Sequence, residues 1–270
     1  MSAFLRVAAL FAAALLSACA SEFVRPVPQG SVGGGERVEI VAAFPDQAHF
    51  TRMAVMRWSD SEFFAPASNW GIPQVATKAV AETLQARHPG MTIVTVPEQF
   101  TSDEFWTFLD AFPSAFDEPY GALPPGKGGR IGDYVRQSTA DLVVVVGGVG
   151  DRLPDSNETV RGVPARSFGM FSTVWAQDDQ PRISAFAAVR VLAVVKPELA
   201  RIGVADATEC YDPQCPGEKT NRWKDDGRRY GSWDAVKAIR TDPAMEAMVR
   251  NDVRGAVDAA VRRAVTNMKF

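Results

Sequence analysis

The first part of the chain alternates apolar and polar residues and then changes to helical spacing. Apolar residues alternate with polar ones from Arg37, which predicts a strand that ends near residues 44–46. A second strand is predicted over residues 51–58. Apolar residues then recur at three- and four-residue steps from Ile72, which predicts a helix that ends at residues 88–90.

The pattern in the middle of the chain predicts a strand, two helices and a long loop. Residues 91–96 are rich in β-branched side chains, which favours a strand. Thr101 and Glu104 have the spacing of a capping box and open a helix. A loop rich in proline and glycine is predicted over residues 113–130, followed by a short helix over residues 131–138.

The second half of the chain is predicted to complete the sheet. Residues 141–146 form a continuous apolar run, which is typical of a central strand covered on both faces. Residues 167–175 and 183–195 flank the polar turn at residues 177–180 and predict a β-hairpin. Residues 202–205 are expected to extend this sheet.

The clearest helix lies at the C-terminal end. Asp242 is placed as its N-cap, Pro243 begins the first turn, and an apolar stripe runs from Met245 to Met268. The stripe is expected to cover the sheet, with docking on a membrane or partner as the alternative. Together these elements predict an α/β (mixed α+β) fold over residues 37–270. We expect one three-layer-like domain with a mixed parallel and antiparallel sheet, a hairpin in its second half and a C-terminal amphipathic helix.

The N-terminal segment has the features of an export signal. Arg6 precedes a ten-residue apolar run over residues 7–16, and small residues follow. Such a run forms roughly 15 Å of helix, about half of a bilayer core, so we interpret residues 1–18 as a signal peptide rather than a membrane span. Residues 19–36 are rich in proline and glycine and predict a flexible tether.

The sequence Leu16-Ser17-Ala18-Cys19 resembles the lipobox of bacterial lipoproteins. The resemblance implies that Cys19 carries lipid and becomes the mature N-terminus, with its acyl chains in the bilayer. Ala20 in place of an aspartate implies, again by resemblance, retention at the outer membrane facing the periplasm. The alternative is an ordinary secretory signal cleaved after Ala20, which would remove the cysteine.

The overall composition is that of a globular protein and excludes several classes. Apolar residues make up 46% of the chain, charged residues 23%, and the net charge is -3. No basic field is available to hold a nucleic-acid backbone, so nucleic acid is not an expected partner.

The remaining cysteines, Cys210 and Cys215, are separated by a short segment that contains Asp212 and Pro213. In an exported protein this spacing favours a local disulfide. A metal or redox site is the alternative, but the spacing is not that of a Cys-x-x-Cys motif.

The distribution of histidines argues against a serine hydrolase. Ser167 lies in a segment similar to a nucleophile elbow, but both histidines, His49 and His88, precede it, whereas that class requires one after it. We therefore predict no catalytic residue, no cofactor and no metal. An alternative hypothesis is a periplasmic enzyme using a carboxylate or metal site, whose residues would be Asp46, His49, Asp60, Asp151 and Asp155, with Glu62 close by.

A glycine-rich loop follows the predicted central strand and is the candidate ligand site. The carboxyl ends of parallel strands are common binding positions, and glycine allows a ligand to approach the backbone. The candidate residues are Gly147, Gly148, Gly150, Asp151 and Asp155. This loop supports a further alternative, a small-ligand sensor, although an ordinary glycine turn is the favoured explanation of the loop.

The order of elements resembles a group of envelope proteins. Ala140-Asp141 before a buried strand ending at Gly147, the long strand over residues 185–195 and the last helix are similar to the TolB N-terminal domain and to lipoproteins of the CsgG and LpoB type. Residues 196–198 depart from the glycine turn usual in that group. The resemblance implies envelope assembly or partner binding without catalytic residues. We therefore predict a non-enzymatic binding or scaffolding lipoprotein with a protein partner in the cell envelope.

Overall fold

The computed structural model describes most of the chain from Gly35 onward. The described residues are 35–53, 61–112, 121–149, 159–160, 163–164, 167–173, 182–196, 198–210, 230 and 232–268. The strands are β1 (Arg37–Ala43), β2 (Gln47–Met53), β3 (Ser61–Pro66), β4 (Thr92–Phe100), β5 (Leu142–Gly148), β6 (Thr159–Val160), β7 (Val163–Pro164), β8 (Phe168–Thr173), β9 (Arg182–Val195) and β10 (Ala200–Cys210). The helices are α2 (Ile72–Arg87), α3 (Ser102–Leu109), α4 (Gly129–Gln137), α5 (Trp233–Lys237), the 3-10 helix η4 (Ala238–Arg240) and α6 (Pro243–Asn267).

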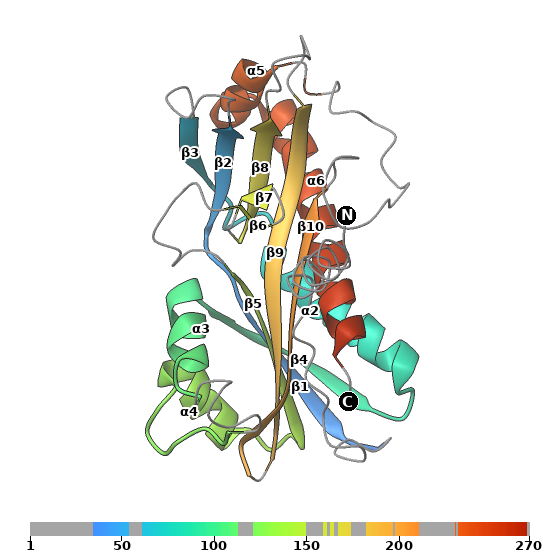
Figure 1. Ribbon diagram of the computed structural model, residues 1–270. Helices are drawn as coiled ribbons and strands as arrows, with labels where there is room; N and C mark the ends of the chain where they lie inside the picture. Colours follow the sequence, from blue (N-terminus) through green and yellow to red (C-terminus); the bar gives the residue numbers. More distant parts are fainter. Residues whose placement is uncertain are drawn as a thin grey trace, which may run out of the picture.

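Strand β9 organises the main sheet because it is long enough to pair with two strands along one edge (Figure 1). Its first part pairs with β8 and its second part with β5, while β10 pairs along the other edge. The sheet order is β3-β2-β8-β9-β5-β1-β4. We call β3, β2 and β8 the β8 half of the sheet, and β5, β1 and β4 the β5 half.

The sheet is mixed, as the sequence predicts. β1 is parallel to both β4 and β5, and β2 is parallel to β8. The hairpin of β8 and β9 is antiparallel and confirms the predicted hairpin. β5 lies inside the sheet with every residue buried, which confirms the central position expected from its apolar run.

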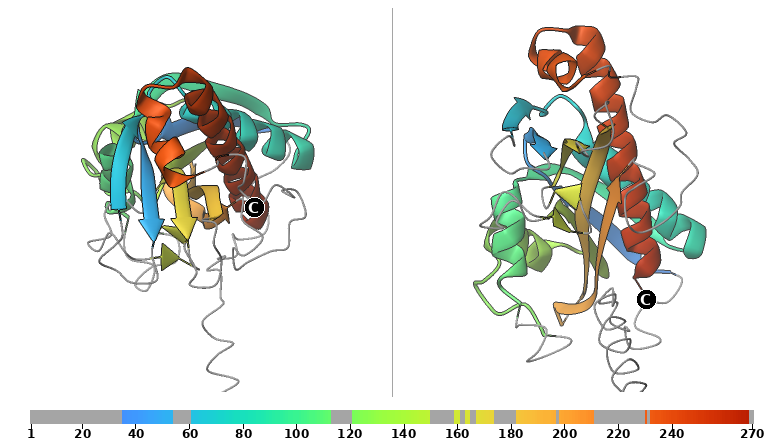
Figure 2. Two further views of the ribbon diagram at one scale, coloured as in Figure 1. Left: turned by 90° about the horizontal axis from the view of Figure 1, so that it is seen from above. Right: turned by 45° about the horizontal axis from the view of Figure 1, so that its top comes forward.

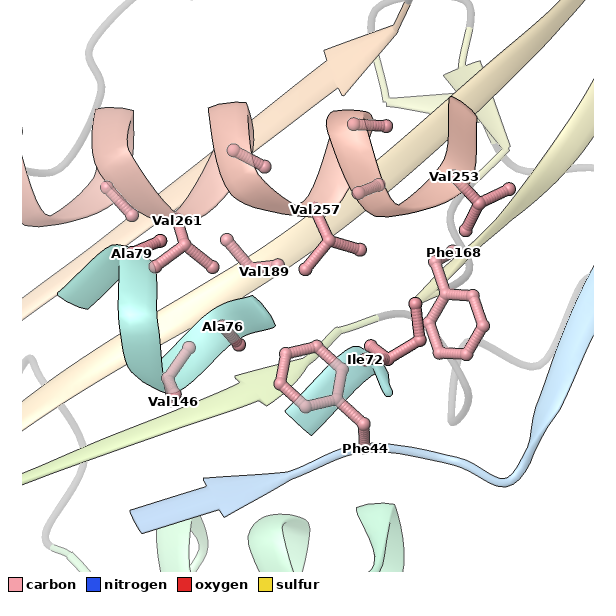
Figure 3. Packing of buried hydrophobic residues seen from close by; sticks show 14 of the residues in the cluster. Phe44, Ile72, Ala76, Ala79, Val146, Phe168, Val189, Val253, Val257 and Val261 are labelled. Atoms are coloured by element: carbon pink, nitrogen blue, oxygen red, sulfur yellow. The ribbon is translucent and has the colours of Figure 1, made fainter. Parts of the chain in front are cut away.

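The larger hydrophobic core lies between the sheet and helices α2, α5 and α6. The valines Val253, Val257 and Val261 of α6 point toward β9, where Val189 is fully buried, and toward α2 (Figure 3). We call this side of the sheet the α6 face. The apolar stripe of the last helix therefore covers the protein's own sheet, as expected.

A smaller core lies on the opposite side, which we call the α3 face. Phe105 and Phe108 of α3 and Ile131 of α4 pack against the β5 half. Helices α3 and α4 thus lie on one side of the sheet, and α2, α5 and α6 lie on the other (Figure 2). This is the predicted three-layer arrangement.

Two helix caps appear where the sequence places them. Thr101 accepts a hydrogen bond from the Glu104 amide, and the Glu104 carboxylate accepts one in return, which completes the capping box. The Asp242 side chain accepts hydrogen bonds from two amides at the start of α6. These interactions depend on neighbouring residues, so a local pattern is enough to predict them.

The expected strand over residues 51–58 overlaps β2 at residues 51–53, and residues 54–58 lie outside the described residues. β2 begins earlier, at Gln47, and β3 forms a second strand that the sequence did not predict. The polar residues His49 and Thr51 of β2 are buried on one face, as Ala48 and Phe50 are on the other, so a search for apolar positions does not mark its beginning. None of the helices in the described parts of the chain combines the length and apolarity needed to cross a bilayer.

Candidate functional site

The α3 face of the β8 half carries a histidine among aromatic side chains. Ala48 and Phe50 of β2 belong to the core on the α6 face, so His49 between them points to the α3 face. Helices α3 and α4 cover the β5 half instead. We call His49, Glu62, Phe64 and Phe186 the His49 cluster.

His49 is buried and held from three sides. Only 2% of the residue is exposed, and its Nε2 atom is in contact with the Glu62 carboxylate of β3. Its ring centroid lies 5.1 Å from that of Phe64 and 6.4 Å from that of Phe186, which it meets nearly edge-on. The orientation of the imidazole is therefore fixed by packing and by a carboxylate.

Gly169 makes the approach of these strands possible. It lies directly opposite His49 in the parallel pairing of β2 and β8. A Cβ atom at this position would lie 1.7 Å from the His49 carbonyl oxygen. Phe186 is paired with Gly169 on the other side, so the histidine and phenylalanine rings meet across a residue without a side chain.

A buried imidazole next to a carboxylate is the orienting half of many acid-base sites. Glu62 is the more accessible member, because 31% of its side chain is exposed compared with 3% for His49. The described residues contain no group of three or more metal-ligating side chains. Among the described residues, Glu62 is therefore the side chain through which the buried imidazole reaches the surface.

The structure separates the two described residues of the proposed carboxylate site. Asp46 is exposed at the connection before β2, whereas His49 is buried and contacts Glu62 across the β2–β3 hairpin. Asp60, Asp151 and Asp155 lie outside the described residues. From the sequence, Glu62 is only a nearby carboxylate, because the hairpin register that joins it to His49 does not follow from the local pattern.

Packing explains the first two glycines of the candidate ligand loop. A Cβ atom on Gly147 would lie 2.6 Å from the Phe105 ring, and one on Gly148 would lie 2.3 Å from the Ser167 side chain. Gly150, with Asp151 and Asp155, lies outside the described residues. The ligand loop therefore stays a prediction, while Gly147 and Gly148 have a role in the contact between strand β5 and its neighbours.

An ion pair next to this loop was not predicted. Arg190 of β9 is paired with Gly147 of β5, and its guanidinium binds Asp206 of β10 through two hydrogen bonds of 2.5 and 2.7 Å. The hydrogen bond to Asp206 raises the pKa of Arg190. The sequence signal was a single arginine within a long apolar strand, which left its partner unknown.

The cysteine predictions fall largely outside the described residues. Cys210 is the last residue of β10, and Cys215 and the lipobox cysteine Cys19 lie outside the described residues. The predicted disulfide and the lipid attachment therefore both stay predictions.

No protein-family model matches the chain, and no curated protein matches its sequence. Among solved structures, PelC from Paraburkholderia phytofirmans, crystallised as a dodecamer, has a TM-score of 0.33 and 8% identity over 92% of this chain and 98% of its own. A DUF330 protein from Xanthomonas campestris has a TM-score of 0.34 and 9% identity over 91% of this chain and 88% of its own. A hypothetical protein from Chlamydia trachomatis has a TM-score of 0.27 and 12% identity over 84% of this chain and 98% of its own. Similarity at this level carries no inference about function or assembly.

Proposed function

We propose that this protein is a lipoprotein anchored in the outer membrane and facing the periplasm, where it acts as a non-enzymatic binding or scaffolding component of the cell envelope. The sequence Leu16-Ser17-Ala18-Cys19 is the observation that carries the proposal. A cysteine in this context resembles the acceptor of a lipid anchor, and two or three acyl chains hold a protein stably in a bilayer.

The position of the first strand is consistent with a body held at a distance from the membrane. β1 begins at Arg37, after the segment rich in proline and glycine that starts at Cys19. At about 3.3–3.6 Å per residue, such a segment would reach roughly 60 Å when fully extended. A lipid anchor at Cys19 would then leave the domain free to meet a partner in the periplasm.

The use of the polar side chains supports a binding role rather than catalysis. Glu39 accepts hydrogen bonds from Tyr134 and Ser138, which ties α4 to β1. Arg190 binds Asp206 between neighbouring strands, and His49 is held between two rings and Glu62. Each of these groups has a structural explanation in the packing of the sheet.

Substitution of the lipobox cysteine tests the anchor. In cells fed labelled palmitate, wild-type protein should carry label and sediment with membranes, whereas Cys19→Ala should be unlabelled and released with the soluble periplasmic fraction. Cys210→Ala is the matched control, because it removes a cysteine outside the lipobox and should leave labelling unchanged.

Mass spectrometry of the mature N-terminus distinguishes the alternative. A lipidated Cys19 supports the proposal, whereas an unmodified chain that begins after Ala20 would overturn it. Persistent membrane attachment of Cys19→Ala would also show that something other than this anchor holds the protein.

A further inference from the structure

The edges of the main sheet differ in how they are closed. At the beginning of β10, the Leu123 amide donates to the Leu199 carbonyl and the Arg201 amide to the Gly121 carbonyl, so another segment covers the first residues of this edge. On β3, the Arg240 guanidinium donates to the Phe64 carbonyl. β4 pairs only with β1 in the described part of the chain. Among the described residues, no backbone hydrogen bond reaches the other edge of β4 over residues 92–96.

The backbone direction of β4 identifies which groups face outward. The Thr92 amide donates to the Glu36 carbonyl over 2.9 Å, so Thr92 faces toward β1. Because the N–H and C=O groups of a strand alternate in direction, Val94 also faces β1, whereas Ile93 and Thr95 direct theirs to the open edge. These two residues offer two donors and two acceptors to an added strand.

The open segment is short, uncharged and rich in β-branched residues. It comprises residues 92–96, and Val94 is 37% exposed, one of two large hydrophobic residues that are exposed among those the structure describes. The regular pairing with β1 is interrupted between Ile40 and Ala42, opposite Pro97, which has no amide hydrogen. Beyond it, Glu98 binds Arg130. The irregular pairing and Pro97 thus limit the available edge to residues 92–96.

We propose that this edge binds a second copy of the chain, with the two β4 strands antiparallel about a two-fold axis at Val94. Ile93 of each copy then exchanges hydrogen bonds with Thr95 of the other, which uses every outward donor and acceptor of these residues. Val94 faces Val94 of the second copy as a non-hydrogen-bonded pair, at a Cα–Cα distance of about 4.5 Å. The two sheets become continuous through β4.

The composition of the edge favours a second copy as the occupant. Antiparallel pairing about Val94 places Thr92 opposite Val96 and Ile93 opposite Thr95, so β-branched residues face one another throughout. The nearest charged residue, Glu98, falls opposite Gly90, so the symmetry brings no like charges together. An isologous contact of this kind requires such self-complementarity. The inference does not depend on the proposed lipid anchor.

Cysteine crosslinking tests the symmetry directly. In whole cells producing the full chain, Val94→Cys should form a disulfide-linked dimer under mild oxidation, because the two Val94 positions lie within disulfide reach. Thr92→Cys is the matched control. Its two copies would be about 13 Å apart along the strands, beyond that reach. Wild-type protein is the second control, because any dimer that it forms must arise from crosslinking through its own cysteines, such as Cys210 or Cys215.

The outcomes separate the possible occupants. A dimer with Val94→Cys that is absent from Thr92→Cys and wild type supports the proposal. Equal crosslinking of both variants indicates random collision and overturns it. No crosslinking, or linkage of Val94→Cys to a chain of different mass, also overturns it, provided that the variants keep the wild-type circular dichroism spectrum and melting temperature.

A second variant distinguishes the loss of pairing between the two β4 strands from a failure of the protein to fold. Thr95→Pro removes the outward amide without removing a hydrogen bond to β1, and proline is accepted where an edge strand directs its amide outward. In the Val94→Cys background, Thr95→Pro should reduce crosslinking at least tenfold while the circular dichroism spectrum is unchanged. Undiminished crosslinking in this folded double variant would overturn the proposed hydrogen-bonded pairing.

Discussion

Glu39 shows how a single buried polar residue can be made stable. It lies on β1 with 6% of its surface exposed. Burial alone raises the pKa of Glu39, but hydrogen bonds from Tyr134, Ser138 and Arg37 outweigh this effect and lower the pKa. Tyr134 and Ser138 each donate over 2.7 Å. The charged carboxylate is therefore favoured in the folded protein, and it fixes the end of α4 on the sheet.

The lowered pKa of Glu39 predicts how stability depends on pH. A carboxyl group with a lowered folded pKa contributes stability above its unfolded pKa, near 4.5, and loses this contribution as the pH falls through the folded value. Tyr134→Phe removes one donor, so the folded pKa should rise. We expect a loss of about 2 kcal/mol at neutral pH and an acid-unfolding midpoint at higher pH.

Circular dichroism during acid titration and urea unfolding measure both effects. Asp234→Asn is the control: its pKa is lowered by a hydrogen bond from Lys237, but 84% of the Asp234 side chain is exposed, so its replacement should leave stability nearly unchanged. An unchanged acid midpoint in Tyr134→Phe would contradict the assigned role of this hydrogen bond.

At the scale of elements, α6 is stabilised by different groups at its two ends. Asp242 caps the beginning, as its own sequence predicts. At the other end, the Arg87 guanidinium of α2 donates to the Val265 carbonyl over 2.8 Å and to the Met268 carbonyl over 3.1 Å. The positive charge of Arg87 at this position also stabilises the helix by its attraction to the negative end of the helix dipole. The last turn of α6 thus depends on a residue distant in the sequence.

Replacement of Arg87 should loosen this turn. Arg87→Met keeps an apolar stem but removes the donors, so we expect a loss of about 1–2 kcal/mol in the free energy of unfolding. Hydrogen exchange should become faster at residues 264–268 and stay unchanged at the Asp242 end. Lys78→Met, at a residue whose side chain is 72% exposed in an i,i+4 pair with Glu82, should change stability by less than about 0.5 kcal/mol. Equal effects of both variants would argue against capping by Arg87.

At the scale of the whole molecule, the sheet separates two cores of different size. The core on the α6 face extends over both halves of the sheet, whereas the core on the α3 face covers mainly the β5 half. Phe105 joins α3 to the sheet, because its ring occupies the space where Gly147 lacks a side chain. The α3–α4 layer should therefore open at a lower free energy than the rest of the domain.

Phe105→Ala tests this difference between the layers. Removal of the buried ring should destabilise the protein by about 3–5 kcal/mol. Hydrogen exchange should accelerate most in α3 and α4, while α6 keeps more of its protection. Val257→Ala, on the other face, is the control and should accelerate exchange in α6 and the central strands. Equal acceleration in α3 and α6 after Phe105→Ala would indicate one cooperative unit.

Features that depend on near neighbours in the chain follow from local sequence patterns. The caps at Thr101 and Asp242, the periodicity of α2 and α6, the burial of β5 and the hairpin of β8 and β9 all follow from residues close together in the chain. The mixed sheet followed from the order of these elements.

The pairing of distant segments, in contrast, is seen only in the folded protein. The register of β2 with β3 brings Glu62 to His49, and the length of β9 lets β8 and β5 share one edge. The same pairing leaves β4 at the border of the sheet with Ile93 and Thr95 facing outward. Strand register depends on contacts between segments far apart in sequence, and many pairings are compatible with one local pattern. A sequence pattern alone therefore cannot place the His49 cluster or the open edge.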